Sequence, residues 1–266
     1  MSAFKGVEDT LFIPLVGRIY SSKNFKEFFY DSKALELEKY ISSDLIKENT
    51  SEYFTIASVA RFYEFDNMVK EFINKNKECN ILCLGCGLET MYFRVNDKRA
   101  TFYEIDFPKV IKQRKIVLKE NEKEILIGSN LLDYSWIDKV DTSLPTLAIA
   151  SGVFQYLHYE DVVLLLKELQ NKFNNIEIAF DATNKIGIKG AVKYVKKTGN
   201  TDAMMYFYLQ DIEEFAKEVN SNLIKVVPFY KNSSKILKNK LKFSTKFNCY
   251  FGDKLGFTKI VHLKLK

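Results

Sequence analysis

Apolar residues recur at three- and four-residue steps through the first part of the chain, and this pattern changes near residue 79. The stretches SSKNFKEFFYDSKALELEKYI (21–41) and SEYFTIASVARFYEFDNMVKEFINK (51–75) therefore predict amphipathic helices, the second starting at Ser51. Strands that alternate with helices predict an α/β fold with a parallel sheet built of βα units. Beyond residue 79, helical stretches alternate with short apolar runs: NILCL (80–84), ATFYEI (100–105), EILIG (124–128), TLAIA (146–150) and IEIAFD (176–181).

The alternation stops after Asp181. Residues 182–209 are small, glycine-containing and basic and then aromatic, and a helical stretch, DIEEFAKEVNSN, follows. Two late runs, STKFNCYF (244–251) and FTKIVHLKLK (257–266), predict strands on either side of the turn signal GDKLG. We therefore predict a single domain over 1–266. Its parts are a helical N-terminal segment (1–78), a core (79–181), a cap and linker region (182–243) and a closing β-hairpin (244–266).

Composition narrows the class of protein. The 266 residues are 47% hydrophobic, which is enough to bury a full core. The chain has no run of about 18 apolar residues, so no transmembrane span is predicted. The N-terminal stretch MSAFKGVEDTLF lacks the features of a secretory signal, and four cysteines in a chain of this length do not indicate a disulfide framework. We expect a cytoplasmic protein.

The net charge of +6 raises the question of a nucleic-acid partner. Almost all of the positive charge is lysine, whereas proteins that read base edges rely on arginine forks. The sequence therefore indicates a solvated lysine surface, and we expect no nucleic-acid partner. The densest lysine run is KNSSKILKNKLKFSTK, from Lys231 to Lys246. Such a run is typical of a solvated face or mobile loop, and the alternative is a surface for an anionic partner.

The stretch CNILCLGCGLET, from Cys79 to Thr90, has two interpretations. Its cysteines follow the spacing C-x3-C-x2-C, which holds a four-iron, four-sulfur cluster in radical enzymes. Such cysteines need an irregular loop on which to converge, but Cys83 falls inside a predicted strand, on the same face as Cys79 and Ile81. The alternative is that these cysteines are small buried hydrophobic residues.

The second interpretation of this stretch is a glycine turn that brings the backbone close to a nucleotide. LGCGLET follows the first strand of a βα unit, where Gly85 allows a tight turn. Asp106 ends the next strand, 21 positions after Gly85, where a carboxylate can accept both ribose hydroxyls; the alternative is a helix N-cap before Pro108. Thr90 stands where a dinucleotide site has its third glycine, so the pattern favours S-adenosylmethionine over NAD.

Segments spread along most of the chain carry a resemblance to a known family. Together they resemble the leucine carboxyl methyltransferase family, specifically its bacterial branch, which is similar to the tetracenomycin polyketide synthesis O-methyltransferase. The resemblance implies a class I, Rossmann-like S-adenosylmethionine-dependent methyltransferase fold. That fold has a seven-stranded, mostly parallel sheet with an antiparallel last strand, here with a helical N-terminal extension and a cap, and 79–181 as its cofactor-binding core. The segments are DTLFIPLVGRIYSSK (9–23), FYDSKALEL (29–37), VARFYEFDNMV (59–69), ILCLGCGLETMYFR (81–94), YEIDFPKVIKQRK (103–115), GSNLLDYSWI (128–137), SGVFQYL (151–157) and FDATN (180–184).

The resemblance also implies roles for individual residues. Arg61 corresponds to the arginine that pairs with the methionyl carboxylate of S-adenosylmethionine, and a half-buried guanidinium suits a bidentate carboxylate. The alternative for Arg61 is an ion pair with Glu64 or Asp66. The remaining cofactor positions are Gly85 and Gly87 at the methionine end, Asp106 at the ribose, Asn130 and Leu131 at the adenine ring, and Ser151 beside the methyl group.

Some of these positions depart from the family's pattern or have a second interpretation. Ser151 begins a segment where the family often has an acidic residue, and a hydroxyl cannot carry that charge. Asn130 replaces the more usual aspartate but can still bond an exocyclic amine. Tyr156 corresponds to a tyrosine near the acceptor and is the candidate catalytic residue; the alternative is a partly buried aromatic at a helix start. Arg18 is assigned to the cofactor, the acceptor or the surface.

The predicted reaction is methyl transfer from S-adenosylmethionine to a carboxylate or hydroxyl of a small molecule, polyketide-like or another metabolite. A carboxylate is ionised at neutral pH and needs no general base, so positioning and desolvation would carry catalysis. A phenol or alcohol would need a base, for which Tyr156 and His158 are candidates, although His158 is expected at the surface. Because the other histidine, His262, lies in the last predicted strand, no metal site is predicted.

Four alternative functions stay open at this point. They are a protein C-terminal carboxyl methyltransferase, a radical enzyme with an iron–sulfur cluster, a nicotinamide dehydrogenase, and a non-catalytic protein that binds S-adenosylmethionine. The aromatic stretch MMYFYL (204–209) belongs to the predicted cap and either lines an acceptor pocket or forms core. No membrane partner is expected, and a protein substrate is compatible with the family.

Overall fold

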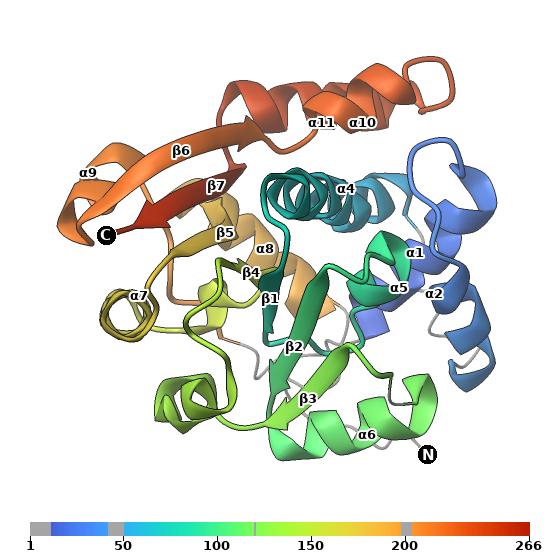
Figure 1. The fold of residues 1–266 in the computed structure, drawn as a ribbon. Coiled ribbons are helices and arrows are strands. Elements are labelled where there is room, and N and C mark those ends of the chain that lie inside the picture. Colours follow the sequence, from blue (N-terminus) through green and yellow to red (C-terminus); the bar gives the residue numbers. More distant parts are fainter. Residues whose placement is uncertain (1–11, 42–50, 120, 198–203) are drawn as a thin grey trace.

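The computed structural model describes residues 12–41, 51–119, 121–197 and 204–266. A seven-stranded sheet in the order β3-β2-β1-β4-β5-β7-β6 forms its centre (Figure 1). β7 pairs antiparallel with β5 and β6 and the other pairs are parallel, so the predicted fold class with its antiparallel last strand is confirmed. The strands are β1 (Cys79–Leu84), β2 (Ala100–Asp106), β3 (Glu124–Gly128), β4 (Thr146–Ala150), β5 (Ile176–Thr183), β6 (Ser221–Pro228) and β7 (Thr258–Leu265).

Helices cover both faces of this sheet. α4 packs over one face, and α7 and α9 pack over the other. None of the described helices has the length and apolar character that a membrane span requires. Residues 1–12, from which no secretory signal was predicted, lie outside the described residues except for Phe12. The helices are α1 (Phe12–Asn24), α2 (Ser32–Leu37), α4 (Glu52–Lys75), α5 (Met91–Val95), α6 (Pro108–Leu118), α7 (Tyr159–Lys172), α8 (Lys185–Lys197), α9 (Ile212–Glu218), α10 (Lys231–Ile236) and α11 (Phe243–Lys254).

Side chains of the inner strands alternate between two hydrophobic cores. In β1, Cys79, Ile81 and Cys83 belong to the core beneath α4. Leu82 and Leu84 belong to the core beneath α7 and α9. Every residue of β1 is buried, and this two-sided burial explains why the strand is a continuous apolar run rather than an alternating one.

The closing β-hairpin predicted over 244–266 is wrong in its first half. Residues Phe243–Lys254 form helix α11, and β7 pairs instead with β6, which lies inside the predicted cap and linker region. The run STKFNCYF is rich in aromatic residues, a composition typical of strands. Two of its three aromatic side chains, Phe247 and Tyr250, are exposed on the helix surface, so they do not report the burial that the prediction assumed. β6 was missed because it is a half-exposed edge strand.

The single helix predicted over 21–41 is divided in two, with residues 25–31 between α1 and α2. The side chain of Asp31 accepts a hydrogen bond from the Ala34 N–H at 2.8 Å and so caps α2. Asp31 is also fully buried and pairs with Arg18 of α1 at 3.2 Å. A tertiary ion pair therefore fixes the break, and the local apolar spacing could not indicate it.

Candidate functional site

A cavity of about 950 Å³ opens at the carboxyl ends of β1, β2, β4 and β5. β1 and β4 are neighbours in the middle of the sheet, and the strand order runs away from them in opposite directions. Open α/β sheets bind ligands at such a switch point. Helices α1, α4 and α8 supply further walls. The volume lies near the upper end of the range of about 300–1,000 Å³ for ligand pockets.

The turn after β1 borders this cavity and requires glycine. Gly85 and Gly87 have backbone φ angles of +62° and +50°, which residues with a side chain rarely adopt. A Cβ at position 85 would lie 2.6 Å from Cγ2 of Val153, another residue that lines the cavity. The structure therefore brings both predicted glycines to the cavity, with their backbone exposed to whatever it holds.

Asp106 ends β2 and lines the same cavity. Its Oδ2 accepts from the Gly87 N–H at 2.8 Å, and its Oδ1 accepts from the Phe107 N–H at 2.7 Å. The N-cap of α6 is Phe107, with no side-chain capping bond, so the alternative of a helix cap is not observed. Each carboxylate oxygen has a second lone pair, so Asp106 can accept from hydroxyl groups while it holds the turn.

A buried ion-pair cluster that the sequence did not reveal supports this turn from behind. Arg114 of α6 donates to the carbonyl oxygens of Gly87 and Glu89 at 3.2 and 2.5 Å. Its Nη2 lies 2.6 Å from a carboxylate oxygen of Glu124 and 3.1 Å from one of Glu104, and all three side chains are fully buried. Burial raises the pKa of Glu104 to about 7, although Arg114 opposes the shift. The cluster fixes the backbone that borders the cavity.

A second buried cluster joins the N-terminal helices to the same turn. Arg18 donates to the Leu88 carbonyl at 2.7 Å and pairs with Asp31. Arg94 donates to Glu89 at 2.7 Å. Burial alone would raise the pKa of Glu89, but Arg94 and Arg18 outweigh it and lower that pKa to about 2. The surface alternative for Arg18 is wrong, because its side chain is buried at the cavity wall, where Nη1 and Nη2 are hydrogen-bonded.

Arg61 and Asp181 meet at the carboxyl ends of β4 and β5. Nη1 of Arg61 lies 3.4 Å from Oδ2 of Asp181, and Oδ1 of Asp181 accepts from the Gly152 N–H at 2.5 Å. Nε of Arg61 and Oγ of Ser151 are buried and have no hydrogen-bond partner among the described residues. All four residues line the cavity. This corner therefore combines the cation of Arg61 and the anion of Asp181 with two buried polar atoms that have no hydrogen-bond partner among the described residues.

The expected alternatives for Arg61 are wrong. Glu64 accepts a hydrogen bond from Asn232, and Asp66 pairs with Arg94 at 2.7 Å. Arg61 instead forms an ion pair with Asp181, 120 positions away in the chain, and no local sequence pattern predicts such a pair. The segment FDATN contributed to the family resemblance, but no sequence pattern assigned Asp181 to the site.

The other predicted site residues border the same cavity. Asn130 and Leu131 lie beyond the carboxyl end of β3, and Oδ1 of Asn130 accepts from the Leu132 N–H at 3.1 Å. Tyr156 lines the cavity from the short 3₁₀ helix Phe154–Tyr156 after β4. All predicted site residues thus share one cavity, and their individual roles stay predictions.

The aromatic stretch 204–209 divides between the cavity and a core. Met205 lines the cavity, whereas Phe207 is buried in the core beneath α7 and α9. His158 is exposed at the N-cap of α7, where a surface residue was expected. Its ring stacks on Tyr206, with 4.2 Å between ring centroids. Only part of this stretch is therefore placed to meet a ligand.

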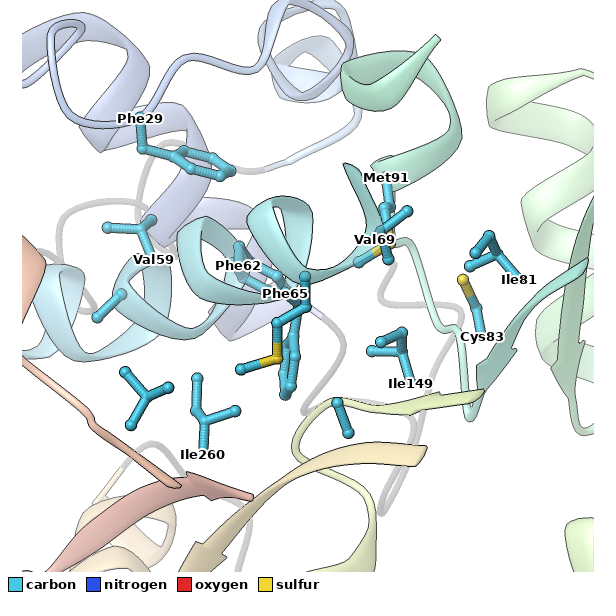
Figure 2. Close-up of a cluster of buried hydrophobic side chains, with 14 of the residues drawn as sticks. Phe29, Val59, Phe62, Phe65, Val69, Ile81, Cys83, Met91, Ile149 and Ile260 are labelled. Atoms are coloured by element: carbon cyan, nitrogen blue, oxygen red, sulfur yellow. The ribbon is translucent and has the colours of Figure 1, made fainter. Parts of the chain in front are cut away.

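The cysteines of the turn are buried in the core beneath α4. Cys79, Cys83 and Cys86 all belong to it, and Figure 2 shows Cys83 there with Ile81 and Ile149. Burial raises the pKa of Cys79 to about 11 and those of Cys83 and Cys86 well above the usual value for a thiol. Because Cys79 and Cys83 lie in β1 and all three cysteines pack in this core, the interpretation as small hydrophobic residues is confirmed. Within the described ranges, no three His, Cys, Asp or Glu side chains are grouped to hold a metal ion.

Comparisons with known proteins agree with this geometry. The model of the leucine carboxyl methyltransferase family matches residues 13–170. The chain is 25% identical to the tetracenomycin polyketide synthesis O-methyltransferase TcmP of Streptomyces glaucescens over 178 residues, 66% of each protein. It is 24% identical to leucine carboxyl methyltransferase 1 of Rattus norvegicus over 162 residues, 48% of this chain and 49% of that protein. The chain thus spans just under two thirds of the first relative and about half of the second.

Two solved structures share the fold. A methyltransferase candidate from Thermobifida fusca YX has a TM-score of 0.60 at 12% identity, with 94% of each chain covered. The magnesium protoporphyrin IX methyltransferase ChlM from Synechocystis PCC 6803 with bound S-adenosylhomocysteine has a TM-score of 0.52 at 11% identity, covering 96% of this chain and 100% of that one. At these identities the likeness shows the fold alone.

The fold and the family match together define a class, the class I S-adenosylmethionine-dependent methyltransferases, as the sequence predicted. Within this class, the chain belongs to the leucine carboxyl methyltransferase family, whose model matches more than half of its length. The predicted family is therefore confirmed.

Proposed function

We propose that the chain transfers a methyl group from S-adenosylmethionine to an oxygen atom of a small-molecule acceptor. The observation that carries the proposal is the corner where Arg61, Asp181 and Ser151 meet. Nε of Arg61 and Oγ of Ser151 are buried there without a hydrogen-bond partner among the described residues. Because buried polar atoms are rarely left unsatisfied, a polar ligand is expected to complete them. An amino-acid end with one carboxylate and one ammonium fits this mixture of charges.

Arg61 and Asp181 would hold the two ends of that zwitterion. Arg61 has a free Nε with which to bind the methionyl carboxylate, and Asp181 supplies an oxygen for the ammonium. Ala150 of β4 pairs with Phe180 of β5, so Ser151 and Asp181 follow at adjacent positions of neighbouring strands. Asp181 therefore brings a carboxylate to the corner where Ser151 cannot.

The rest of the cofactor would lie along the strand ends. The turn at Gly85 and Gly87 approaches the methionine portion, and Asp106 accepts from the ribose hydroxyls, in keeping with its place at the end of β2. Asn130 and Leu131 border the cavity beyond β3, where the adenine ring would lie. This order, from Arg61 to Asn130, follows the cavity from β5 across β4, β1 and β2 to β3.

Methyl transfer to a carboxylate would require the protein to position the reactants more than to transfer a proton. When bound, S-adenosylmethionine supplies an electrophilic methyl group. A carboxylate acceptor is ionised near neutral pH and needs no general base. The cavity walls then serve to orient the acceptor and exclude water. Tyr156 lines the cavity, where its hydroxyl would donate a hydrogen bond to the acceptor oxygen. With a phenol or alcohol acceptor, the tyrosinate form of Tyr156 would take the acceptor's proton and become the neutral hydroxyl.

The lining favours an apolar small molecule as the acceptor. Tyr53, Phe54, Phe229 and Phe257 all border the cavity, and aromatic walls with a few polar groups suit such ligands. The similarity to a polyketide synthesis O-methyltransferase supports the same choice. Methylation of a protein's C-terminal carboxylate is the second candidate, supported by the family and by the similarity to the rat enzyme.

Calorimetric titration of S-adenosylhomocysteine tests the cofactor site. We expect micromolar binding to the wild type and binding at least about tenfold weaker, about 1.4 kcal/mol, for Asp106→Ala and for Arg61→Met. Asp138→Ala is the matched control, because Asp138 is exposed in another part of the chain and does not line the cavity. No binding to the wild type would refute the methyltransferase proposal.

A transfer assay tests the acceptor. The protein is incubated with S-adenosylmethionine and either aromatic carboxylates and phenols or a peptide ending in a leucine carboxylate, and methylated products are identified by mass spectrometry. We expect methylation of small molecules. Methylation of the peptide alone would replace the proposal with its second candidate. Tyr156→Phe should lower the rate with a phenol far more than with a carboxylate, because only the phenol needs its proton removed.

A further inference from the structure

Helix α11 presents three aromatic side chains to solvent and three small residues to the protein. Phe243, Phe247 and Tyr250 are 82%, 52% and 60% exposed. Their spacing of four and then three residues places them on one face of the helix. The buried positions of the helix are Thr245, Cys249 and Gly252. This is the reverse of an ordinary surface helix, whose apolar residues face the core.

Packing explains the inner face of α11 but not the outer one. A Cβ at Gly252 would lie 3.0 Å from the ring of Tyr230, so larger side chains do not fit there. The hydroxyls of Tyr230 and Tyr53 are hydrogen-bonded at 3.1 Å, and both tyrosines line the main cavity. α11 therefore covers the outside of a cavity wall. Figure 1 shows α10 and α11 as an outer layer above α4, and the three exposed rings do not line the main cavity.

The chain segment that carries these rings is basic, although Glu52 of α4 lies against its start, where its Oε1 accepts from the Lys242 N–H at 2.8 Å. No Asp or Glu occurs between Val219 and Gly252. Ion pairs join Lys225 to Glu71 and Lys240 to Glu27. The other lysines of this stretch are exposed and form no salt bridge with the described residues; they are Lys231, Lys235, Lys238, Lys242 and Lys246. We call Phe243, Phe247 and Tyr250, with Lys242 and Lys246 beside them, the α11 face.

We propose that the α11 face binds an anionic lipid bilayer. Aromatic rings flanked by lysines on an exposed helix allow a peripheral protein to place the rings at the headgroup level while the lysines attract anionic lipids. A bilayer needs no complementary groove. A second copy of the chain is disfavoured, because a symmetric contact would bring the same lysines together. The prediction of no membrane partner considered spanning segments, and a peripheral contact requires none.

Cosedimentation with vesicles tests this proposal. One set of vesicles contains phosphatidylcholine alone, and the other an equimolar mixture of phosphatidylcholine and phosphatidylglycerol. We expect the full-length wild type to bind the mixed vesicles at low salt and not the neutral ones. The variant Phe243→Ser/Phe247→Ser should bind at least about tenfold more weakly. The control Ile116→Ser/Leu164→Ser, which removes apolar side chains 61% and 52% exposed on α6 and α7, should bind as the wild type does.

A charge variant separates the lysines from the rings. Lys242→Glu/Lys246→Glu should also bind at least about tenfold more weakly, and added salt should release the wild type, because screening weakens attraction to anionic lipids. Both lysines are exposed, and circular dichroism checks that every variant stays folded.

Three outcomes would overturn the proposal. The first is that the wild type does not sediment with the mixed vesicles, or that the variant Phe243→Ser/Phe247→Ser binds them as strongly as the wild type does. The second is binding of polyglutamate but not of vesicles, which would assign the α11 face to an acidic protein. The third is a dimer in sedimentation velocity that the variant Phe243→Ser/Phe247→Ser abolishes, which would assign the face to a second copy.

Discussion

The substitution Gly152→Ala adds one methyl group that would collide with the side chain of Arg61. Gly152 has a φ of +69°, and its Cβ would lie 2.5 Å from Nη1 of Arg61. The backbone conformation alone costs about 1–2 kcal/mol for a residue with a side chain. Ordinary contact needs a separation of about 3.5 Å, so the guanidinium must move by about 1 Å or more. It is held by Asp181 on the same side, so the movement is expected to weaken that pair.

The magnitude follows from these two terms. A hydrogen bond to a charged group contributes about 1.5–3 kcal/mol, and the 3.4 Å separation between Arg61 and Asp181 places this one at the lower end. We therefore expect Gly152→Ala to lower the free energy of unfolding by about 2–4 kcal/mol. If Arg61 holds the methionyl carboxylate, the substitution should also weaken binding of S-adenosylhomocysteine about tenfold or more.

A double-mutant cycle with Arg61→Ala separates the terms. Urea unfolding and calorimetric titration are measured for the wild type, both single variants and the double variant. In the Arg61→Ala background, Gly152→Ala should cost only the backbone term of about 1–2 kcal/mol and leave cofactor binding unchanged. Fully additive effects in both assays would refute the reasoning. Gly190→Ala is the stability control. Outside its own stretch of helix, no atom of the described residues lies within 4 Å of its Cβ, and alanine in helix α8 should stabilise by about 0.5–1 kcal/mol.

The buried groups behind the glycine turn should be visible in pH and reagent experiments. The folded pKa of Glu104, about 7, exceeds the unfolded value of about 4.3, so the free energy of unfolding should fall as pH rises from about 4 to 7; Glu104→Gln should remove this slope in urea titrations. The folded pKa of Glu89, about 2, has the opposite effect, and stability should fall as pH drops from about 4 to 2; a Glu89→Gln variant with the wild-type slope would contradict this. The thiols of Cys83 and Cys86 should react with a disulfide reagent only after unfolding, and rapid reaction of the native protein would show that they are not buried.

Four of the strands that the sequence located, β1, β2, β4 and β5, are buried on both faces, whereas β3 is an edge strand with Ile125 exposed. The predicted run 80–84 differs from β1 by one residue, and 124–128 and 146–150 agree with β3 and β4. Two-sided burial makes such strands continuous apolar runs, and the helices between them punctuate the pattern. The prediction of secondary structure failed where apolar residues are exposed or where a strand is only partly buried. β6 is a half-exposed strand, and α11 carries its aromatic residues on the outside.

The candidate site shows the same division. Residues at strand ends, such as Gly85 and Asp106, could be found because a βα unit fixes where its turn and its following acid lie. The partners Asp181 and Arg114 could not be found, because each meets its site through a contact between distant parts of the chain. Their charge is visible in the sequence, but their placement depends on the packing of whole elements.

The buried cluster around Arg18 makes the first helices part of one cooperative folding unit. Arg18 and Asp31 come from the N-terminal helices, and they complete the charges around Glu89 and the Leu88 carbonyl. A buried charge that loses its partner costs about 3–5 kcal/mol, against a total stability of about 5–15 kcal/mol for a domain. We therefore expect the Rossmann-like part of the chain to be less stable without these helices. During synthesis, we expect the charges of Arg18 and Asp31 to be fully paired only after the turn that follows β1 has been made.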